Sequence, residues 1–134
     1  MRFQSLEEFE KLGLLLAEAD FEQADCRWET NGASFVLETA RPASEALKGA
    51  GLFRKPRPNW IKCRLVIRQV RKLSLWEEYD AKPPFHTLLK AEPAEGGFKI
   101  RLASAHGLRV DLTVDRLDGV LEEAESSAET DRRI

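Results

Sequence analysis

The sequence predicts a single α+β domain, in which an N-terminal helix covers one face or one end of a single, mainly antiparallel sheet of about six strands. Most of the chain alternates hydrophobic and polar residues with a period of two, as strands with one buried face do. Only the first 20 residues repeat hydrophobic residues at helical spacing. Short connections between successive strands favour a meander, which can curl toward a half-barrel.

A covering helix is predicted from Leu6 to Ala19. Ser5 and Glu8 form a capping box, in which the serine hydroxyl accepts from a first-turn N–H and the glutamate accepts from the serine N–H. Hydrophobic residues then recur at spacings of three and four, which places one stripe against the core: Leu6, Phe9, Leu12 and Leu16.

A hairpin is predicted around Asn31-Gly32, the strongest short turn signal in the sequence. A two-residue turn there pairs Trp28 with Phe35 and Cys26 with Leu37. The four hydrophobic residues then share one face, so the register agrees with the hydrophobic pattern.

A long alternating stretch begins at Trp60, with odd positions from Ile61 to Ile67 facing the core. The alternation changes phase near Gln69-Val70 and resumes at Leu73. Either a bulge bends one strand of unusual length, or two shorter strands meet at a corner.

Three further strands are predicted over residues 85–92, 98–103 and 108–114, where a loop at 104–106 pairs Leu102 with Leu108. A short helix is expected at 117–121. We expect residues 1–124 to form the domain and residues 125–134 to form a flexible tail, because that tail has almost no hydrophobic residues.

The composition is typical of a globular protein, with 43% hydrophobic and 33% charged residues among 134. Acidic residues interrupt the N-terminal hydrophobic run, and no segment has the ~20 apolar residues of a membrane helix. We therefore expect a cytoplasmic protein that does not contact a membrane. Cys26 and Cys63 are expected to be buried free thiols.

The net charge of −2 is unevenly distributed. Residues 1–45 carry −6, residues 46–76 carry +9 without any carboxylate, and residues 77–134 carry −5. The chain thus contains a basic block whose charges the fold can either gather or disperse.

No catalytic motif is present, and no cofactor or metal site is predicted. We interpret His86 and His106 as structural and loop residues. Asp111 and Asp115 are expected to pair with Lys99 and Arg101 across a ladder. The acids around Tyr79, which are Glu77, Glu78 and Asp80, fit a solvated strand end better than a cation site.

The basic block predicts a non-enzymatic binding protein whose partner is anionic, either a nucleic acid or an acidic protein surface. Alternate cations along the strand recur every ~6.6 Å, close to the spacing of phosphates in a nucleic-acid strand, and a tryptophan can stack on a base. The candidate contact residues are an arm and a stripe: Arg54, Lys55, Arg57, Trp60, Lys62, Arg64 and Arg68.

Two other interpretations stay open. The cations can form a solvated face that the protein's own acids neutralise; the pI near 5.8 favours this over nucleic-acid recognition. Carboxylates within ~4 Å of each cation would indicate it. Alternatively, hydrophobic residues around Leu52-Phe53 and Trp60, or Trp76 with Tyr79, form a protein-interaction or homodimer surface. In layout the chain resembles many short bacterial proteins, a likeness too general to assign a role to any residue.

Overall fold

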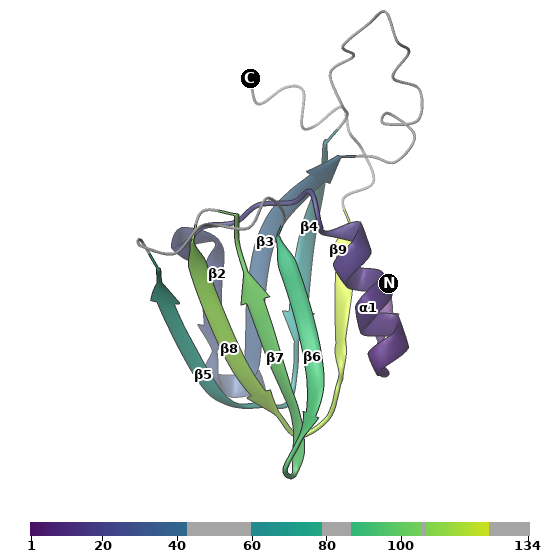
Figure 1. Cartoon of the computed structure of the whole chain (residues 1–134), viewed down its shortest axis with the longest axis vertical. Helices are drawn as coiled ribbons and strands as arrows, with labels where there is room; N and C mark the ends of the chain where they lie inside the picture. The colour runs from purple at the N-terminus through teal and green to yellow at the C-terminus, as the bar shows by residue number, and fades with distance from the viewer. Residues whose placement is uncertain (43–59, 79–86, 106, 124–134) are drawn as a thin grey trace, which may run out of the picture.

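The computed structural model describes residues 1–42, 60–78, 87–105 and 107–123. These residues form two antiparallel sheets that face each other, with one α-helix at their side (Figure 1). One sheet has five strands in the order β1-β9-β4-β3-β2, and the other has four in the order β5-β8-β7-β6. The elements are β1 (Arg2–Phe3), α1 (Leu6–Leu15), η1 (Gln23–Asp25), β2 (Cys26–Glu29), η2 (Thr30–Gly32), β3 (Ser34–Pro42), β4 (Trp60–Ile67), β5 (Val70–Glu77), β6 (Leu88–Ala94), β7 (Gly97–Ala103), β8 (Leu108–Val114) and β9 (Gly119–Glu123).

The α+β class is confirmed, but the prediction of a single sheet of about six strands is wrong. The chain passes from β4 in one sheet to β5 in the other through Arg68 and Gln69, so the second alternative for this stretch, two shorter strands meeting at a corner, is the observed one. Gln69 has a φ of 63°, which turns the chain sharply between the strands. A register shift between Val70 and Lys72 then accounts for the change of phase.

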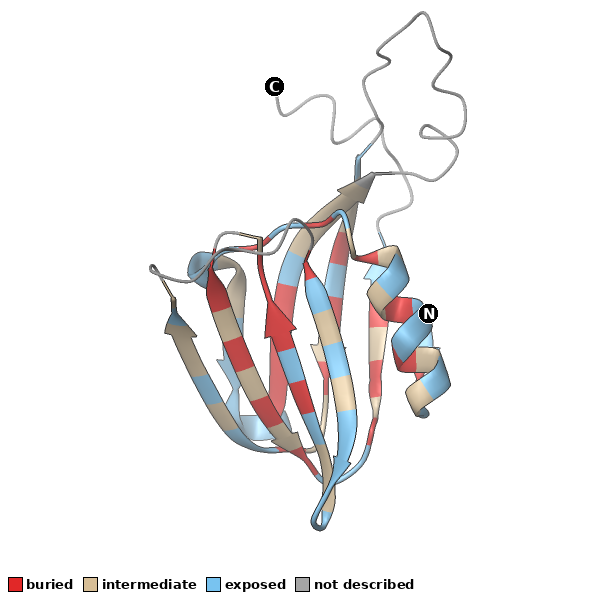
Figure 2. Ribbon diagram, viewed as in Figure 1, coloured by how far each residue is buried: buried red, intermediate tan, exposed pale blue. Residues whose placement is uncertain are grey.

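The core lies between the two sheets. Of the predicted inward positions of β4, Cys63, Leu65 and Ile67 are buried and Ile61 is partly buried. They face the inward positions of β7 and β8, and along most of these strands buried residues alternate with less buried ones (Figure 2). Fully buried side chains on these three strands are Leu65, Ile67, Ile100, Leu102, Val110, Leu112 and Val114. Burying each of them contributes about 1.5–3 kcal/mol to folding, so this layer contributes substantially to stability.

The register of the β2–β3 hairpin is confirmed: Cys26 pairs with Leu37 and Trp28 with Phe35. The turn itself differs from the prediction. The last pair is Glu29 with Ser34, and the loop between them is a 3-10 turn that ends in Ala33 with a φ of 47°. A four-residue loop preserves the same side-chain parity as a two-residue one, which is why the register survives.

Helix α1 begins where predicted and ends at Leu15, earlier than Ala19. The Ser5 hydroxyl accepts from the Glu8 N–H at 3.2 Å, as expected, whereas the Glu8 carboxylate accepts from the N–H of Gln4 at 2.8 Å instead of that of Ser5. The helix lies against β6 and β1 and therefore closes one side of the sandwich, where each sheet has an edge strand (Figure 1).

Two local predictions in the C-terminal part are wrong. Residues predicted as a helix at 117–121 include the first residues of β9, which pairs with β4 and β1. In the β7–β8 hairpin, Leu102 pairs with Val110 instead of Leu108, although the same residues face the core. None of the helices within the described ranges is both long and apolar enough to cross a membrane. The predicted tail, 125–134, lies outside the described residues.

We predict that Gly119→Ala destabilises the fold, because a Cβ at this position would lie 2.4 Å from the Phe3 ring and 2.4 Å from the Val66 carbonyl oxygen. Overpacking of this kind typically lowers the free energy of unfolding by about 1–3 kcal/mol. Urea denaturation followed by circular dichroism measures this change. The matched control is Gly13→Ala in α1, whose Cβ would lie at ordinary contact distance, 3.4 Å from the Leu89 carbonyl oxygen. Equal stability of both variants would contradict this close packing of β9 against β1.

Candidate anion-binding surfaces

The predicted contact residues divide into described and undescribed groups. The arm, Arg54, Lys55 and Arg57, lies outside the described residues. The stripe lies on β4 and just after it, where Trp60, Lys62 and Arg64 alternate with the buried inward residues. The pleat therefore places Trp60, Lys62 and Arg64 on the outer face of the five-stranded sheet.

Arg64 is engaged by an acid of the neighbouring strand. The Glu38 carboxylate, directly opposite on β3, accepts from Arg64 Nη2 at 3.2 Å and from Arg27 Nη1 at 3.1 Å. The hydrogen bond from Arg64 is the largest of the causes that hold the pKa of Glu38 below its ordinary value. The positive charges of Arg64 and Arg27 and the hydrogen bond from Arg27 act in the same direction. Arg64 is thus neutralised within the sheet.

Arg68 also has an acidic neighbour: its guanidinium lies 3.9 Å from an Asp118 carboxylate oxygen. Both arginines of the stripe therefore meet the distance expected for a self-neutralised face. Lys62 differs, since it lies opposite Ala40 and makes no ion pair within the described parts of the chain. Beside it in the stripe, Trp60 is 37% exposed.

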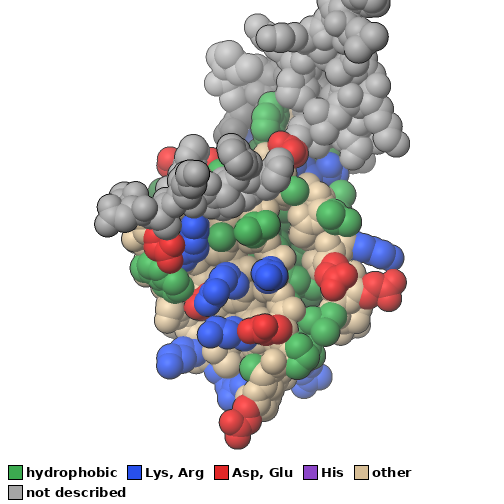
Figure 3. Space-filling view, viewed as in Figure 1, with side chains coloured by type: hydrophobic (Ala, Val, Ile, Leu, Met, Phe, Trp, Pro, Cys, Tyr) green, Lys and Arg blue, Asp and Glu red, His purple; other side chains and the backbone are tan. Residues whose placement is uncertain are grey.

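The outer face of the four-stranded sheet holds a second group of cations. We refer to the four-stranded sheet as sheet B, and to this outer surface as the sheet-B face. Register places its side chains in three parallel rows across β6, β7, β8 and β5. The first row is Leu88, Ala103, Arg109 and Trp76; the second is Lys90, Arg101, Asp111 and Ser74; the third is Glu92, Lys99, Thr113 and Lys72. Figure 3 shows this face, with Lys and Arg side chains gathered over the middle of the sheet and hydrophobic side chains beside them.

The cations in the second and third rows differ in how they are paired. Arg101 donates to both carboxylate oxygens of Asp111, at 2.9 and 3.2 Å, and this hydrogen bonding raises the pKa of Arg101. Lys72, Lys90 and Lys99 make no hydrogen bond or ion pair among the residues that the structure describes. A shallow pocket of about 130 Å³ lies between β6 and β7, lined by Lys90, Ala91, Glu92, Lys99 and Arg101.

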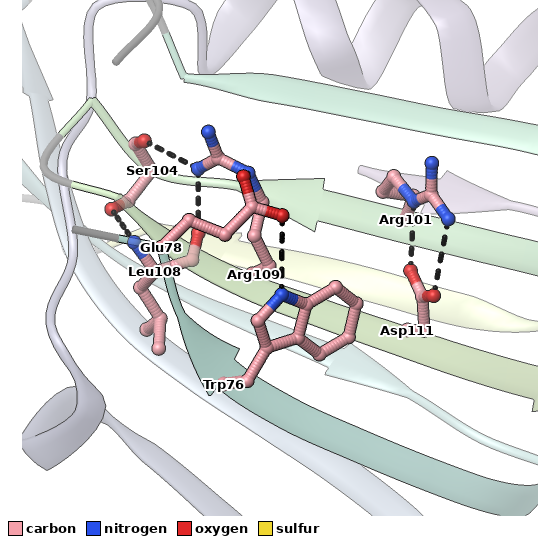
Figure 4. A network of polar contacts seen from close by, with 7 residues as sticks. All are labelled: Trp76, Glu78, Arg101, Ser104, Leu108, Arg109 and Asp111. Carbon is pink, nitrogen blue, oxygen red and sulfur yellow. Dashed lines mark hydrogen bonds and ion pairs between the residues drawn. The ribbon is translucent and has the colours of Figure 1, made fainter. Parts of the chain in front are cut away.

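The end of this face near the first row is held by a polar network (Figure 4). The Trp76 indole N–H donates to one Glu78 carboxylate oxygen at 3.2 Å, and Arg109 Nε lies 3.7 Å from the other. Arg109 also donates to the carbonyl oxygens of Ser104 and Leu108, at 3.3 and 3.1 Å. Glu78 therefore fixes the orientation of both Trp76 and Arg109.

Part of this arrangement follows the sequence prediction. The pairing of Arg101 with Asp111 is confirmed, whereas Asp115 pairs with Arg71 at 2.6 Å instead of with Lys99. The prediction missed that Lys90 and Lys72 share a face with Lys99. The alternation within each strand indicates that each of these lysines faces outward. Only the strand order shows that the three lie together.

Neither described cysteine is an activated nucleophile. Burial is the main factor that raises the pKa of both Cys63 and Cys26 to about 11, so both thiols are protonated at neutral pH. Within the described ranges no three His, Cys, Asp or Glu side chains gather to hold a metal ion. His86, His106, Tyr79 and Asp80 lie outside those ranges.

Comparison with known proteins adds no functional information, since no family model, curated protein or solved structure matches this chain.

We predict that Cys63 reacts slowly with a thiol reagent while the protein is folded. A pKa of about 11 in place of 9.0 leaves about 100-fold less thiolate at pH 8, and the side chain is only 4% exposed. The measurement is the rate of reaction with a chromogenic disulfide in the Cys26→Ser variant at pH 8, with the urea-unfolded variant as control. A folded-state rate equal to the unfolded one would contradict the burial of this thiol.

We also predict that Glu78→Ala loosens the Trp76 indole and lowers the free energy of unfolding by about 1–2 kcal/mol, because it removes the acceptor of a partly buried N–H and the anion beside Arg109. Tryptophan fluorescence in a Trp28→Phe, Trp60→Phe background reports on Trp76 alone, and its emission should shift to the red. Glu95→Ala, in the exposed turn between β6 and β7, is the control. If the background protein, its Glu78→Ala variant and its Glu95→Ala variant all have the same emission maximum, Glu78 does not hold the indole.

Proposed function

We propose that this chain is a non-catalytic binding protein that contacts an anionic partner through the sheet-B face. The observation that carries the proposal is the contrast between three lysines that share this face without an ion pair to described residues and the paired arginines of the stripe. Lys72, Lys90 and Lys99 make no ion pair with described residues, whereas Arg64 and Arg68 have carboxylates within 4 Å.

This contrast matters energetically because an ammonium group that is already solvated and unpaired can engage a partner without first losing an internal ion pair. Arg64 would have to give up Glu38, or share it, before it could bind an external anion. The local excess of positive charge also favours encounter with an anion despite the net charge of −2. The interaction should therefore weaken as salt is added.

The predicted arm and stripe remain a second candidate surface for the same function. The observation that favours it is that Lys62 also makes no ion pair within the described ranges and follows the partly exposed Trp60. The seven residues proposed for this surface are Arg54, Lys55, Arg57, Trp60, Lys62, Arg64 and Arg68.

An assembly role finds less support. The large exposed hydrophobic side chains in the described parts lie at different places in the fold: Met1 before β1, Leu14 on α1, Trp28 on β2, Trp60 on β4 and Leu88 on β6. Leu52, Phe53 and Tyr79, which were expected to contribute, lie outside those parts. Light scattering coupled to size-exclusion chromatography tests the assembly role, and a dimer at micromolar concentration would favour it.

The test uses fluorescein-labelled polyglutamate of about 15 residues as the anionic probe and measures fluorescence anisotropy. We expect binding at 25 mM salt that weakens at 200 mM salt. The Lys90→Glu, Lys99→Glu double variant should lose about tenfold in affinity or more, because each substitution replaces attraction by repulsion.

The matched control is Arg2→Glu, Lys11→Glu, which changes the net charge equally but on β1 and α1, outside both candidate surfaces. We expect it to lose less than about twofold. If the control loses as much affinity as the sheet-B variant, or if wild-type protein shows no salt-dependent binding, the sheet-B face is not the contact surface.

A further inference from the structure

The sheet-B face combines a hydrophobic row with rows of cations. Leu88 and Lys90 are two residues apart on β6 and point to the same side, so their side chains leave the sheet about 7 Å from each other. The same spacing separates Ala103 from Arg101 on β7. A partner that fits this face must therefore present an apolar side chain and an acid about 7–10 Å apart.

The hydrophobic row is exposed at Leu88, partly exposed at Trp76, and buried between them at Ala103, which is 6% exposed. Leu88 is 49% exposed, at one end of the row, and pairs with Ala103 on β7. At the other end the Trp76 ring is oriented by its hydrogen bond to Glu78. The Arg109 side chain between them is only 12% exposed and its head group bonds to main-chain carbonyls and lies beside Glu78, so it supports the row from within and offers a partner little surface.

The cation rows also contain carboxylates, which decide between the two classes of anionic partner. Asp111 is already paired with Arg101, and Glu92 lies opposite Lys99 on the neighbouring strand. A nucleic-acid strand carries a phosphate about every 7 Å, so a strand laid across this face would bring phosphates against these acids. A protein segment can instead place single carboxylates beside Lys90 and Lys99 and avoid both acids.

We propose that the sheet-B face docks an acidic amphipathic segment of a partner protein, with its carboxylates on Lys90 and Lys99 and its hydrophobic side chains on the exposed ends of the row, Leu88 and Trp76. This inference rests on the proposed function and narrows it from an anionic partner to a protein one. Charge complementarity supplies orientation and encounter rate, and the hydrophobic row supplies the desolvated contact that distinguishes this partner from a simple polyanion.

The test compares four labelled probes by anisotropy at 50 mM salt. Two are 14-residue peptides of Leu, Ala and Glu in which Leu and Glu are segregated, one at helical and one at alternating spacing. The third has the same composition in scrambled order, and the fourth is a 14-nucleotide thymidine strand. We expect at least one segregated peptide to bind about fivefold more tightly than the scrambled peptide and more tightly than the nucleotide strand.

The discriminating variant is Leu88→Ser, which changes an exposed side chain and should leave the fold intact. It should abolish the preference for the segregated peptide while polyglutamate affinity stays within about twofold. Leu14→Ser on α1, where the leucine is 80% exposed, is the matched control and should change neither value.

The possible failures are distinguishable. If polyglutamate binds but the segregated and scrambled peptides bind equally, or if the nucleotide strand binds as tightly as the segregated peptides, the protein-segment inference is overturned while anion binding stands. If no probe binds wild-type protein, the proposed function falls with it.

Discussion

The structure depends on the corner at residues 68–70, where one hydrophobic alternation is divided between two sheets. Gln69 adopts a positive φ there, a conformation that costs a non-glycine residue about 1–2 kcal/mol. Backbone hydrogen bonds to Asp118 (2.8 Å), Asp115 (3.0 Å) and Ala33 (3.0 Å) hold the corner in place. These bonds connect the corner to the β2–β3 loop and to the residues between β8 and β9, where the chain crosses back to the five-stranded sheet. The two crossings between the sheets and the β2–β3 loop therefore stabilise one another.

The sequence predicted best those elements whose register follows from the alternation of side chains between the two faces of a strand. The pairing of Trp28 with Phe35 was predictable because a register slip of one residue would have exposed every core residue of the hairpin. The number of sheets was not predictable in this way. Alternation shows which side of a strand is buried but not which sheet covers it, and a bulge and a corner leave the same change of phase at Gln69. The unusual length of the stretch was the only argument for a corner.

The candidate surface was harder to predict because it is built from distant strands. Lys72 on β5 and Lys99 on β7 lie in one row because both strands pair with β8, where Thr113 lies between the two lysines. After β8 the chain crosses to the five-stranded sheet, where it forms β9. Proximity in sequence instead suggested that Lys62, Arg64 and Arg68 act together with their neighbours. It could not show that Glu38, which lies in the acidic N-terminal part of the chain, would be directly opposite Arg64.

The corner also divides the basic block of residues 46–76. Within its described part, Lys62 and Arg64 point outward from one sheet and Lys72 points outward from the other, on the opposite side of the molecule. Within residues 60–76, the folded protein therefore divides between two faces the positive charge that the unfolded chain carries in one run. Polyanions such as RNA or heparin should bind that unfolded chain more strongly than its net charge suggests, and by mass action they would lower its apparent stability. Short peptides cut from residues 60–76 would share the same affinity, so contacts mapped on such peptides would combine cations that the folded protein places on opposite faces.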